Sequence, residues 1–176
     1  MVAARTPNRV YAPKAARSTT TVRNPRAGAR TGAARASWQA KLRPDRVPKV
    51  VEDHRRGRRL LLPTPLLVGE VVAAIPRGHV MTVGQLRAVL ARRFKADTTC
   101  PLMTGLFARI LAGAVAEDLG QGRAPRWPVW RLVRDDGSLH AKWPLDARYR
   151  ATLLREEGVR LTRRSEHWVA IHTHDS

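Results

Sequence analysis

The sequence predicts a mainly α-helical protein with a small β-hairpin: a winged helix-turn-helix domain after a disordered basic N-terminal arm. Three observations lead to this fold class. Basic residues dominate the chain before residue 60, three amphipathic segments with helix-capping residues follow, and an Asp-Gly pair then separates two short apolar runs. Three helices and then a hairpin is the order of a winged helix, in which the hairpin flanks the third helix.

The predicted basic arm covers residues 1–59. It holds 16 Lys and Arg against three acids, and it is poor in large apolar residues. Such a segment buries too little surface to offset the entropy of ordering it, so we expect it to be disordered. Its last stretch, Asp53 to Arg59 (DHRRGRR), is either a phosphate-binding patch or a solvated linker. We place the winged-helix domain at residues 60–160, and a C-terminal extension with one short strand, EHWVAIH, at residues 161–176.

Three helices are expected after the arm. The first, TPLLVGEVVAAIP, has Thr64 as its cap and Pro65 at its first position, and the second, TVGQLRAVLARRF, begins at Thr82. The third, TTCPLMTGLFARILAGAVAEDL, is long and has Thr98 or Thr99 as its cap. Apolar residues recur at helical spacing in these segments, so each helix has a face for the core.

The remainder of the domain predicts the hairpin and a fourth helix. VWRLV is strand-like, and Asp136-Gly137 is a turn signal before SLHAKW. LDARYRATLLREEG is expected to be a helix that begins at Asp146 and ends at Gly158. In a winged helix, this order places the third helix in the major groove of DNA, with the hairpin beside it.

The net charge indicates the class of partner. The formal charge of +19 attracts polyanions, so nucleic acid is the first partner to consider, and binding should weaken steeply with salt. A genome that raises Arg everywhere, or a solvated tail, is the alternative explanation of this charge. No apolar run approaches the ~20 residues that span a bilayer, so no membrane partner is expected. We expect a cytoplasmic, nucleoid-associated protein that is a monomer.

The single cysteine, Cys100, limits the chemistry. One cysteine excludes an internal disulfide and a thiolate zinc cluster, and we expect no cofactor and no metal. The histidines His167, His172 and His174 lack an acid-rich surrounding and are interpreted as incidental. Cys100 lies at the predicted start of a helix, so it is either a relocated nucleophile or a structural cysteine.

Three motifs occur in order between residues 63 and 160: IPRGHVMTVGQL, PVWRLVRDDGSL and LLREEG. They resemble three segments of the O6-alkylguanine-DNA alkyltransferases and the alkyltransferase-like proteins. The first is similar to Ile-Pro-x-Gly-x-Val-x-Thr-Tyr-x-x-Leu, which links the first two helices of that family's DNA-binding domain. The second is similar to the active-site segment Pro-Cys-His-Arg-Val-Val-x-x-x-Gly-x-Leu, and the third to the closing Leu-Leu-x-x-Glu-Gly. The resemblance implies the family's fold for this part of the chain.

The resemblance also implies which chemistry is missing. In true alkyltransferases a cysteine takes the alkyl group from a flipped guanine, a histidine activates the cysteine, and a glutamate orients the histidine. Here Val129 stands at the cysteine position, Trp130 stands at the histidine position, and only Glu157 matches. Valine has no nucleophilic atom and indole cannot act as a base, so we predict that the chain is not an enzyme. The family's finger arginine aligns near Pro101, and its phosphate-rotating tyrosine aligns with Val83.

Alkyltransferase-like proteins also lack the cysteine, and they bind alkylated bases without repairing them. The resemblance therefore implies a non-catalytic DNA-binding protein that holds a flipped alkylated base in an aromatic pocket. The predicted pocket residues are Val129, Trp130, Arg131, Trp143 and Glu157. The alternative for Trp130 and Trp143, together with Trp127, is that they are core tryptophans between the hairpin and the last helix.

The predicted DNA contacts come from the second and third helices and from the hairpin. They are Thr82, Gln85, Thr99, Thr104, Arg109, Arg131 and Arg134. The alternative is an ordinary core helix with solvated charges around it. We expect double-stranded DNA as the partner, with another repair protein receiving the damage signal. The rival function is general nucleic-acid binding, to RNA or DNA in a ribosome or nucleoid, with a degenerate pocket.

Overall fold

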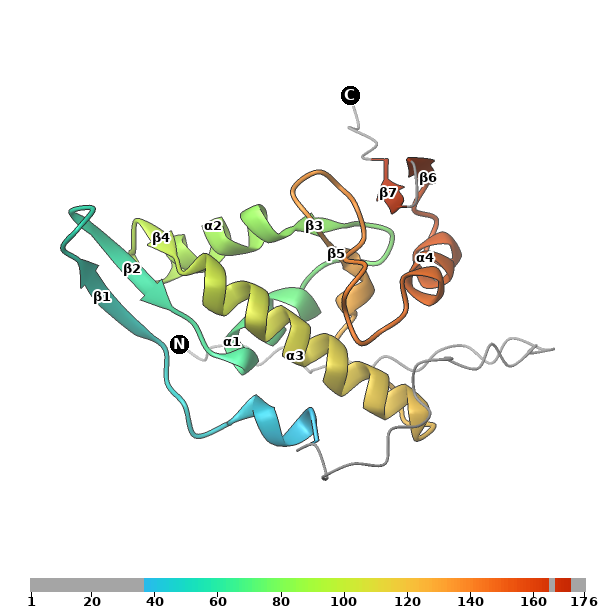
Figure 1. The fold of residues 1–176 in the computed structure, drawn as a ribbon, viewed down its shortest axis with the longest axis horizontal. Helices are drawn as coiled ribbons and strands as arrows, with labels where there is room; N and C mark the ends of the chain where they lie inside the picture. Colours follow the sequence, from blue (N-terminus) through green and yellow to red (C-terminus); the bar gives the residue numbers. More distant parts are fainter. Residues whose placement is uncertain (1–36, 165–166, 172–176) are drawn as a thin grey trace, which may run out of the picture.

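The computed structural model describes residues 37–164 and 167–171, which form four α-helices and several short strands around one core (Figure 1). The elements in chain order are η1 (Gln39–Leu42), β1 (Lys49–Asp53), β2 (Arg58–Leu62), α1 (Pro65–Ala73), β3 (Met81–Thr82), α2 (Val83–Arg93), β4 (Thr98–Thr99), α3 (Pro101–Gly120), η2 (Val129–Arg131), β5 (Leu132–Val133), α4 (Ala147–Glu156), β6 (Leu161–Arg164) and β7 (His167–Ala170). In this part of the chain, no helix is both long and apolar enough to cross a membrane.

The helix starts that the sequence predicts are confirmed for α1, α2 and α4. The Thr64 hydroxyl accepts a hydrogen bond from the Leu67 amide. Thr82 and Gln85 form a reciprocal capping box, and the Asp146 carboxylate caps the first amides of α4. These caps are local in sequence, and each satisfies an amide that has no partner inside its helix.

The predicted cap of α3 is wrong. The helix begins at Pro101 and has no side-chain cap, because Thr98 and Thr99 form the short strand β4 instead. The Thr99 hydroxyl donates to the carbonyl of Arg87, and the Cys100 amide donates to the carbonyl of Leu61. The start of α3 is therefore fixed by its neighbours α2 and β2.

The long helix α3 is the centre of the domain and crosses it from end to end (Figure 1). Leu111, Ala112 and Val115 on its inner side have no solvent exposure. They belong to one apolar core with residues of α1, α2 and α4, such as Val68, Leu90 and Leu154. Because α3 touches most other elements, its remaining outer side is held in a fixed position.

The predicted disorder of residues 1–59 is wrong for residues 37–59, whereas residues 1–36 lie outside the described residues. Residues 37–59 form η1 and most of an antiparallel hairpin, β1–β2, in which Lys49 pairs with Leu62 and Asp53 with Arg58. β2 also pairs in parallel with β4. Leu61, at 0% exposure, fixes this hairpin to the core, so the predicted domain boundary at residue 60 falls inside a strand.

A tryptophan explains why residues 37–42 are ordered. The ring of Trp38 lies against Gly113 of α3, where a Cβ atom would come within 2.2 Å of it. The Glu117 carboxylate accepts hydrogen bonds from the Ser37 hydroxyl and from the amides of Trp38 and Gln39. Composition argues for disorder here, but one aromatic ring and one carboxylate provide the contacts that order the segment.

The hairpin predicted after the third helix is also wrong within the described residues. VWRLV forms the short turn η2 and then β5, which pairs in parallel with β3. Asp136-Gly137 does make a turn, in which the Gly137 amide donates to the Arg134 carbonyl and Gly137 has a φ of 77°. The chain beyond the turn bonds to β7 rather than to β5, through the Leu139 amide and the Trp168 carbonyl.

The C-terminal extension holds two strands where one is predicted. β6 and β7 form an antiparallel pair, with Leu161 opposite Ala170 and Arg164 opposite His167. The two projecting hairpins are therefore β1–β2 and β6–β7, at opposite ends of the molecule (Figure 1). The hairpin position that defines a winged helix, directly after the third helix, is taken by an irregular loop.

Candidate nucleic-acid interface

The first half of α3 presents an apolar strip to solvent. Leu102 is 80% exposed and Leu106 is 52% exposed, one helical turn apart. Gly105 and Arg109 lie on the same side and are also exposed. The strip ends at Gly113, because Trp38 covers α3 there. Large apolar side chains this exposed on one helix face are typical of a surface that a partner covers.

The predicted contact residues divide into exposed and buried groups. Arg109 and Arg134 are exposed, and Arg134 lies only 4.0 Å from the Asp136 carboxylate. Thr99 and Thr104 have no exposure, and the Thr104 hydroxyl donates to the Cys100 carbonyl. The prediction of DNA contacts is therefore wrong for Thr99 and Thr104. A threonine on the inner side of a helix returns its hydroxyl to the backbone, and periodicity alone did not show which side Thr104 faces.

Thr82 and Gln85 remain accessible at the start of α2, but they bond to each other's amides. The Thr82 hydroxyl accepts from the Gln85 amide at 3.1 Å, and the Gln85 side chain accepts from the Thr82 amide at 2.8 Å. Their first role is to hold the start of α2, which borders the outer side of α3. Their predicted contact with DNA stays a prediction.

Arg131 and Glu157 form a buried ion pair. The Nε and Nη2 atoms of Arg131 each donate to a different oxygen of Glu157 at 2.8 Å, and Nη1 donates to the Ile75 carbonyl at 2.6 Å. The two side chains are 7% and 2% exposed. This burial removes Arg131 from the predicted DNA contacts, and a bidentate pair of this kind is strong because both charges are desolvated and satisfied.

Trp130 completes this buried group. Its indole Nε1 donates to the Glu157 carboxylate at 2.9 Å, and the residue is 2% exposed. Burial alone would raise the pKa of Glu157, but hydrogen bonds from Arg131 and Trp130 outweigh that effect and hold the pKa below its ordinary value. The glutamate therefore stays ionised and serves as a structural anchor between η2 and α4.

The predicted pocket around Val129 and Trp130 is wrong, because both residues belong to the core. Val129 is 1% exposed, and Trp127 is 3% exposed against Gly69 of α1. A buried tryptophan needs a partner for its indole N–H, and here the buried carboxylate of Glu157 is that partner for Trp130. The alternative interpretation, that Trp127, Trp130 and Trp143 are core tryptophans, is confirmed, since Trp143 also belongs to the core at 6% exposure.

A hollow of about 450 Å³ lies instead beside the exposed strip of α3. Trp143 lines it, and the other four predicted pocket residues do not. The hollow extends from the start of α2 across α3 to the loop that follows β5. Its lining residues are Val83, Gly105, Ala108, Arg134, Asp135, Asp136, His140 and Trp143.

His140 and Trp143 form the aromatic wall of this hollow. Their rings are stacked, with centroids 4.3 Å apart and planes 3° from parallel. Burial and the charge of Arg150 lower the pKa of His140 to about 4, so its ring is neutral near pH 7. The buried Nε2 atom of His140 has no hydrogen-bond partner among the described residues. No sequence motif indicates a functional role for His140, because it is a single histidine beside a turn.

Arg150 shapes the loop that carries both rings. It is fully buried on α4, donates to the carbonyls of His140 and Leu145, and lies 5.1 Å from the centroid of the Trp143 ring. Burial lowers its pKa to about 10, which leaves it charged near neutral pH. The burial of Arg150 could not be predicted from the sequence, because an arginine on an amphipathic helix is usually on the surface.

The reactive side chains that line the hollow are one histidine and two aspartates. Its lining lacks a cysteine, serine or lysine, and Cys100 lies at the start of α3 outside it. Among the described residues no hydrogen bond involves the Cys100 thiol, and no three His, Cys, Asp or Glu residues gather to hold a metal ion. The lining combines a histidine ring, apolar side chains and nearby charges.

The chain was compared with family models, curated proteins and solved structures. No family model matches it, and no curated protein matches it. Among solved structures, S. pombe ATL in complex with DNA is similar at 19% identity with a TM-score of 0.45. S. pombe Atl1 in complex with damaged DNA containing O6-carboxymethylguanine is similar at 20% identity with a TM-score of 0.42. Each match covers 61% of this chain and 87% of the other.

Proposed function

We propose that this chain is a non-catalytic DNA-binding protein of the alkyltransferase-like kind. The first half of α3 docks in a groove of double-stranded DNA, and the adjoining hollow accepts an extruded alkylated base. The observation that supports this most is the adjacency of the exposed strip and the hollow, which share Gly105. The resemblance of the three sequence motifs to the alkyltransferase family supports the same function.

The exposed strip suits insertion into stacked DNA. Leu102 and Leu106 present apolar side chains with no intramolecular cover, and proteins that extrude bases commonly insert such a wedge between base steps. A leucine of this strip takes the gap-filling role that the arginine finger has in the family. Arg109, one turn further along α3, is placed to contact a phosphate.

The hollow suits a planar heterocycle. Its volume of about 450 Å³ is in the ordinary range of small-ligand sites, and the ring of His140 supplies a planar wall. Trp143 supports that wall from the core: it is 6% exposed and has His140 and Arg150 over its ring. The neutral ring of His140 supports recognition of a planar base by stacking. Since Val129 replaces the acceptor cysteine and is buried, the base would be bound and released unchanged.

General nucleic-acid binding is the second candidate, and one observation favours it. The mouth of the hollow carries Asp135 and Asp136 beside Arg134, so its net charge repels phosphate. The Asp135 carboxylate accepts from the Gly84 amide at 2.6 Å, which holds that charge in place. In this case the hollow would bind no base, and the positive charge of the chain alone would drive binding to nucleic acid.

Equilibrium binding to two matched duplexes, with and without one O6-methylguanine, separates the two candidates. The variant to compare is Gly105→Leu, because a side chain at Gly105 meets no atom within 4 Å and would extend into the hollow. Gly120→Leu is the matched control, since Gly120 also has open space but lies at the far end of α3.

We expect wild type and Gly120→Leu to bind the lesion duplex at least about tenfold more tightly, the size of one good base contact. Gly105→Leu should bind both duplexes alike. Equal binding of both duplexes by wild type would reject the damage-binding function and favour the general binder.

A further inference from the structure

Residues 37–49 lie along the flank of α3 that faces away from the hollow with Trp143. Gly105 and Ala108 face that hollow, whereas Met103, Phe107 and Ile110 face the N-terminal segment. On a helix with 3.6 residues per turn these two sets lie on either side of the strip with Leu102 and Leu106. The exposed strip of α3 therefore has a different neighbour on each flank.

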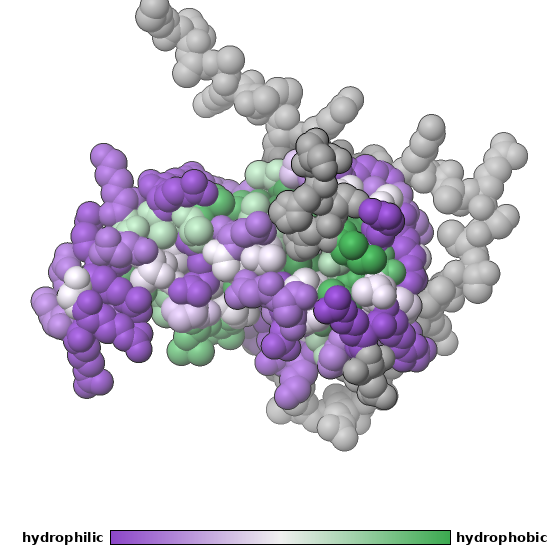
Figure 2. All heavy atoms as spheres, turned by 90° about the horizontal axis from the view of Figure 1, so that it is seen from above, coloured by the Kyte–Doolittle hydropathy of each residue, from purple (hydrophilic) through white to green (hydrophobic). Residues whose placement is uncertain are grey.

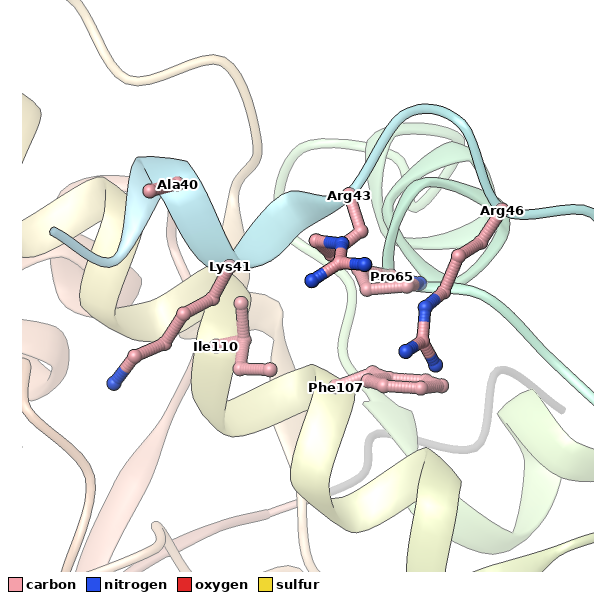
Figure 3. Close-up of a pocket in the computed structure, with 7 residues that line it drawn as sticks. All are labelled: Ala40, Lys41, Arg43, Arg46, Pro65, Phe107 and Ile110. Carbon is pink, nitrogen blue, oxygen red and sulfur yellow. The ribbon is translucent and has the colours of Figure 1, made fainter. Parts of the chain in front are cut away.

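The N-terminal segment places the guanidinium groups of Arg43 and Arg46 over a second hollow, of about 310 Å³ (Figure 3). Lys41 also lines this hollow, but its ammonium lies over the Trp38 ring, 4.1 Å from the centroid. Arg43 and Arg46 extend from this segment toward α3, and Arg46 reaches down to the ring of Phe107. The floor of the hollow is apolar and consists of Pro65, Phe107 and Ile110. An apolar floor strengthens the field of the cations above it, because little water screens them from that side.

The basic surface continues along α3 toward its start. Arg46 also lines a neighbouring hollow of about 360 Å³, together with Lys49 and Met103. The acid in this region, Asp45, lies 3.7 Å from Arg43, and both side chains are more than half exposed, so their pairing is weak. Among the described residues the Arg46 guanidinium forms no hydrogen bond or ion pair, whereas its backbone amide donates to the Arg43 carbonyl at 3.1 Å. We name Lys41, Arg43, Arg46 and Lys49 the basic flank.

We propose that the basic flank binds phosphates of the DNA backbone on the second side of α3. This inference rests on the proposed docking of α3 in a groove of DNA. A helix in a groove has a sugar-phosphate strand on each side, and the flank with Trp143 carries two acids, so the basic flank is the better place for a phosphate.

The basic flank is held in register with α3. Trp38 packs on Gly113, Glu117 holds the amides of Trp38 and Gln39, and the Gln39 side chain donates to the Ala114 carbonyl. Arg43 has a φ of 47°, in the left-handed region that a residue with a side chain enters at a cost, and this bends the segment across the helix. Cations held in place lose less freedom on binding than cations on a mobile tail.

The test is the salt dependence of binding of the full chain to an undamaged duplex. The variant is Arg43→Ala/Arg46→Ala. The charge-matched control is Arg148→Ala/Arg160→Ala, because both residues are exposed near α4, at the other end of the molecule (Figure 1). Arg43→Lys/Arg46→Lys is the rescue variant, since lysine keeps the charge. Thermal unfolding of each variant verifies that the fold is kept.

We expect Arg43→Ala/Arg46→Ala to bind about tenfold more weakly at low salt and to lower the slope of log K against log salt by about two. The lysine variant should keep most of the slope, and the control should bind like wild type. An Arg43→Ala/Arg46→Ala variant that matches the control would overturn the inference while leaving the proposed function intact. Wild type that fails to bind the duplex would overturn both.

Discussion

The two flanks of α3 differ in charge and in construction. One flank is an aromatic hollow with two acids and one arginine, built from the loop after β5 and the start of α2. The other is a basic surface over an apolar floor, which the N-terminal residues 37–49 of the fold provide. Figure 2 shows how hydrophilic the end of the molecule with the β1–β2 hairpin is. Because the two flanks differ in this way, the two roles proposed for them, base recognition and phosphate binding, can be tested separately.

Different anchors support the two flanks. The hollow depends on the buried group Trp130, Arg131 and Glu157, and on Arg150. The basic flank depends on the contact of Trp38 with Gly113 and on Glu117. A substitution in one anchor should therefore change the structure of the flank that it supports before it changes the other flank.

The largest expected effect is that of Glu157→Ala. Removing the carboxylate leaves Arg131 charged and buried, which should lower the free energy of unfolding by about 3–5 kcal/mol. Urea denaturation measures it. The exposed neighbour Glu156→Ala is the control and should stay within about 0.5 kcal/mol of wild type. Equal losses in the two variants would show that the buried pair is not an anchor.

The same pair predicts an acid limit of stability. The pKa of Glu157 is lowered in the folded chain, so its stabilising effect is complete above about pH 5 and falls as the pH drops through the lowered pKa. Glu157→Gln should flatten this part of the curve of stability against pH. A curve of unchanged shape in that variant would contradict the assignment.

Gly113→Ala should act on the basic flank. A methyl group at Gly113 would come within 2.2 Å of the Trp38 ring, so the ring must move. Overpacking of this kind destabilises by about 1–3 kcal/mol, and the basic flank should become mobile. The lesion preference should persist while the salt dependence of DNA binding decreases. Gly120→Ala, which has open space at its Cβ, is the control and should be neutral or stabilising.

His140 gives the hollow a pH signature. The pKa of His140 falls from 6.5 to about 4 in the folded chain. Between pH 6.5 and about pH 4 the His140 ring therefore binds a proton in the unfolded chain but not in the folded chain. Stability should therefore fall as the pH drops from about 6.5 to about 4. His140→Asn should lose less stability over this window, which lies above the window of Glu157. Identical slopes in the two proteins would contradict the buried neutral ring.

The smallest expected effect on stability is that of Gly105→Leu. Leucine is a better helix former than glycine by about 1 kcal/mol, and the added side chain meets no other atom at its Cβ. We expect a gain of about 0.5–1 kcal/mol in the free energy of unfolding. A variant that is more stable yet has lost the lesion preference would separate the function of the hollow from its structural role.

The sequence predicts well what is decided locally. The caps Thr64, Thr82 and Asp146 and the turn at Asp136-Gly137 each involve residues a few positions apart. The order of residues 37–49 could not be read in this way, because Trp38 and Glu117 are 79 positions apart. The basic composition of this segment predicts disorder, but the contact between one tryptophan and one distant glycine orders it.

The candidate site shows the same limit. Trp143 was predicted in a pocket with Val129 and Trp130, whereas it lies in the core at 6% exposure and lines a different hollow. Trp130 was placed in the same pocket, but the buried Glu157 carboxylate draws its indole into the core. His140 and Arg150 escaped notice, because their roles arise from the packing of the loop between β5 and α4 and not from any local pattern.

The most direct test of two separable flanks is one cycle of binding measurements. Wild type, Gly105→Leu, Arg43→Ala/Arg46→Ala and the combined variant are titrated with plain and O6-methylguanine duplexes at two salt concentrations. We predict that Gly105→Leu abolishes the lesion preference and keeps the salt slope, that the arginine variant does the reverse, and that the two effects add. A variant on one flank that changes both quantities together would contradict the account.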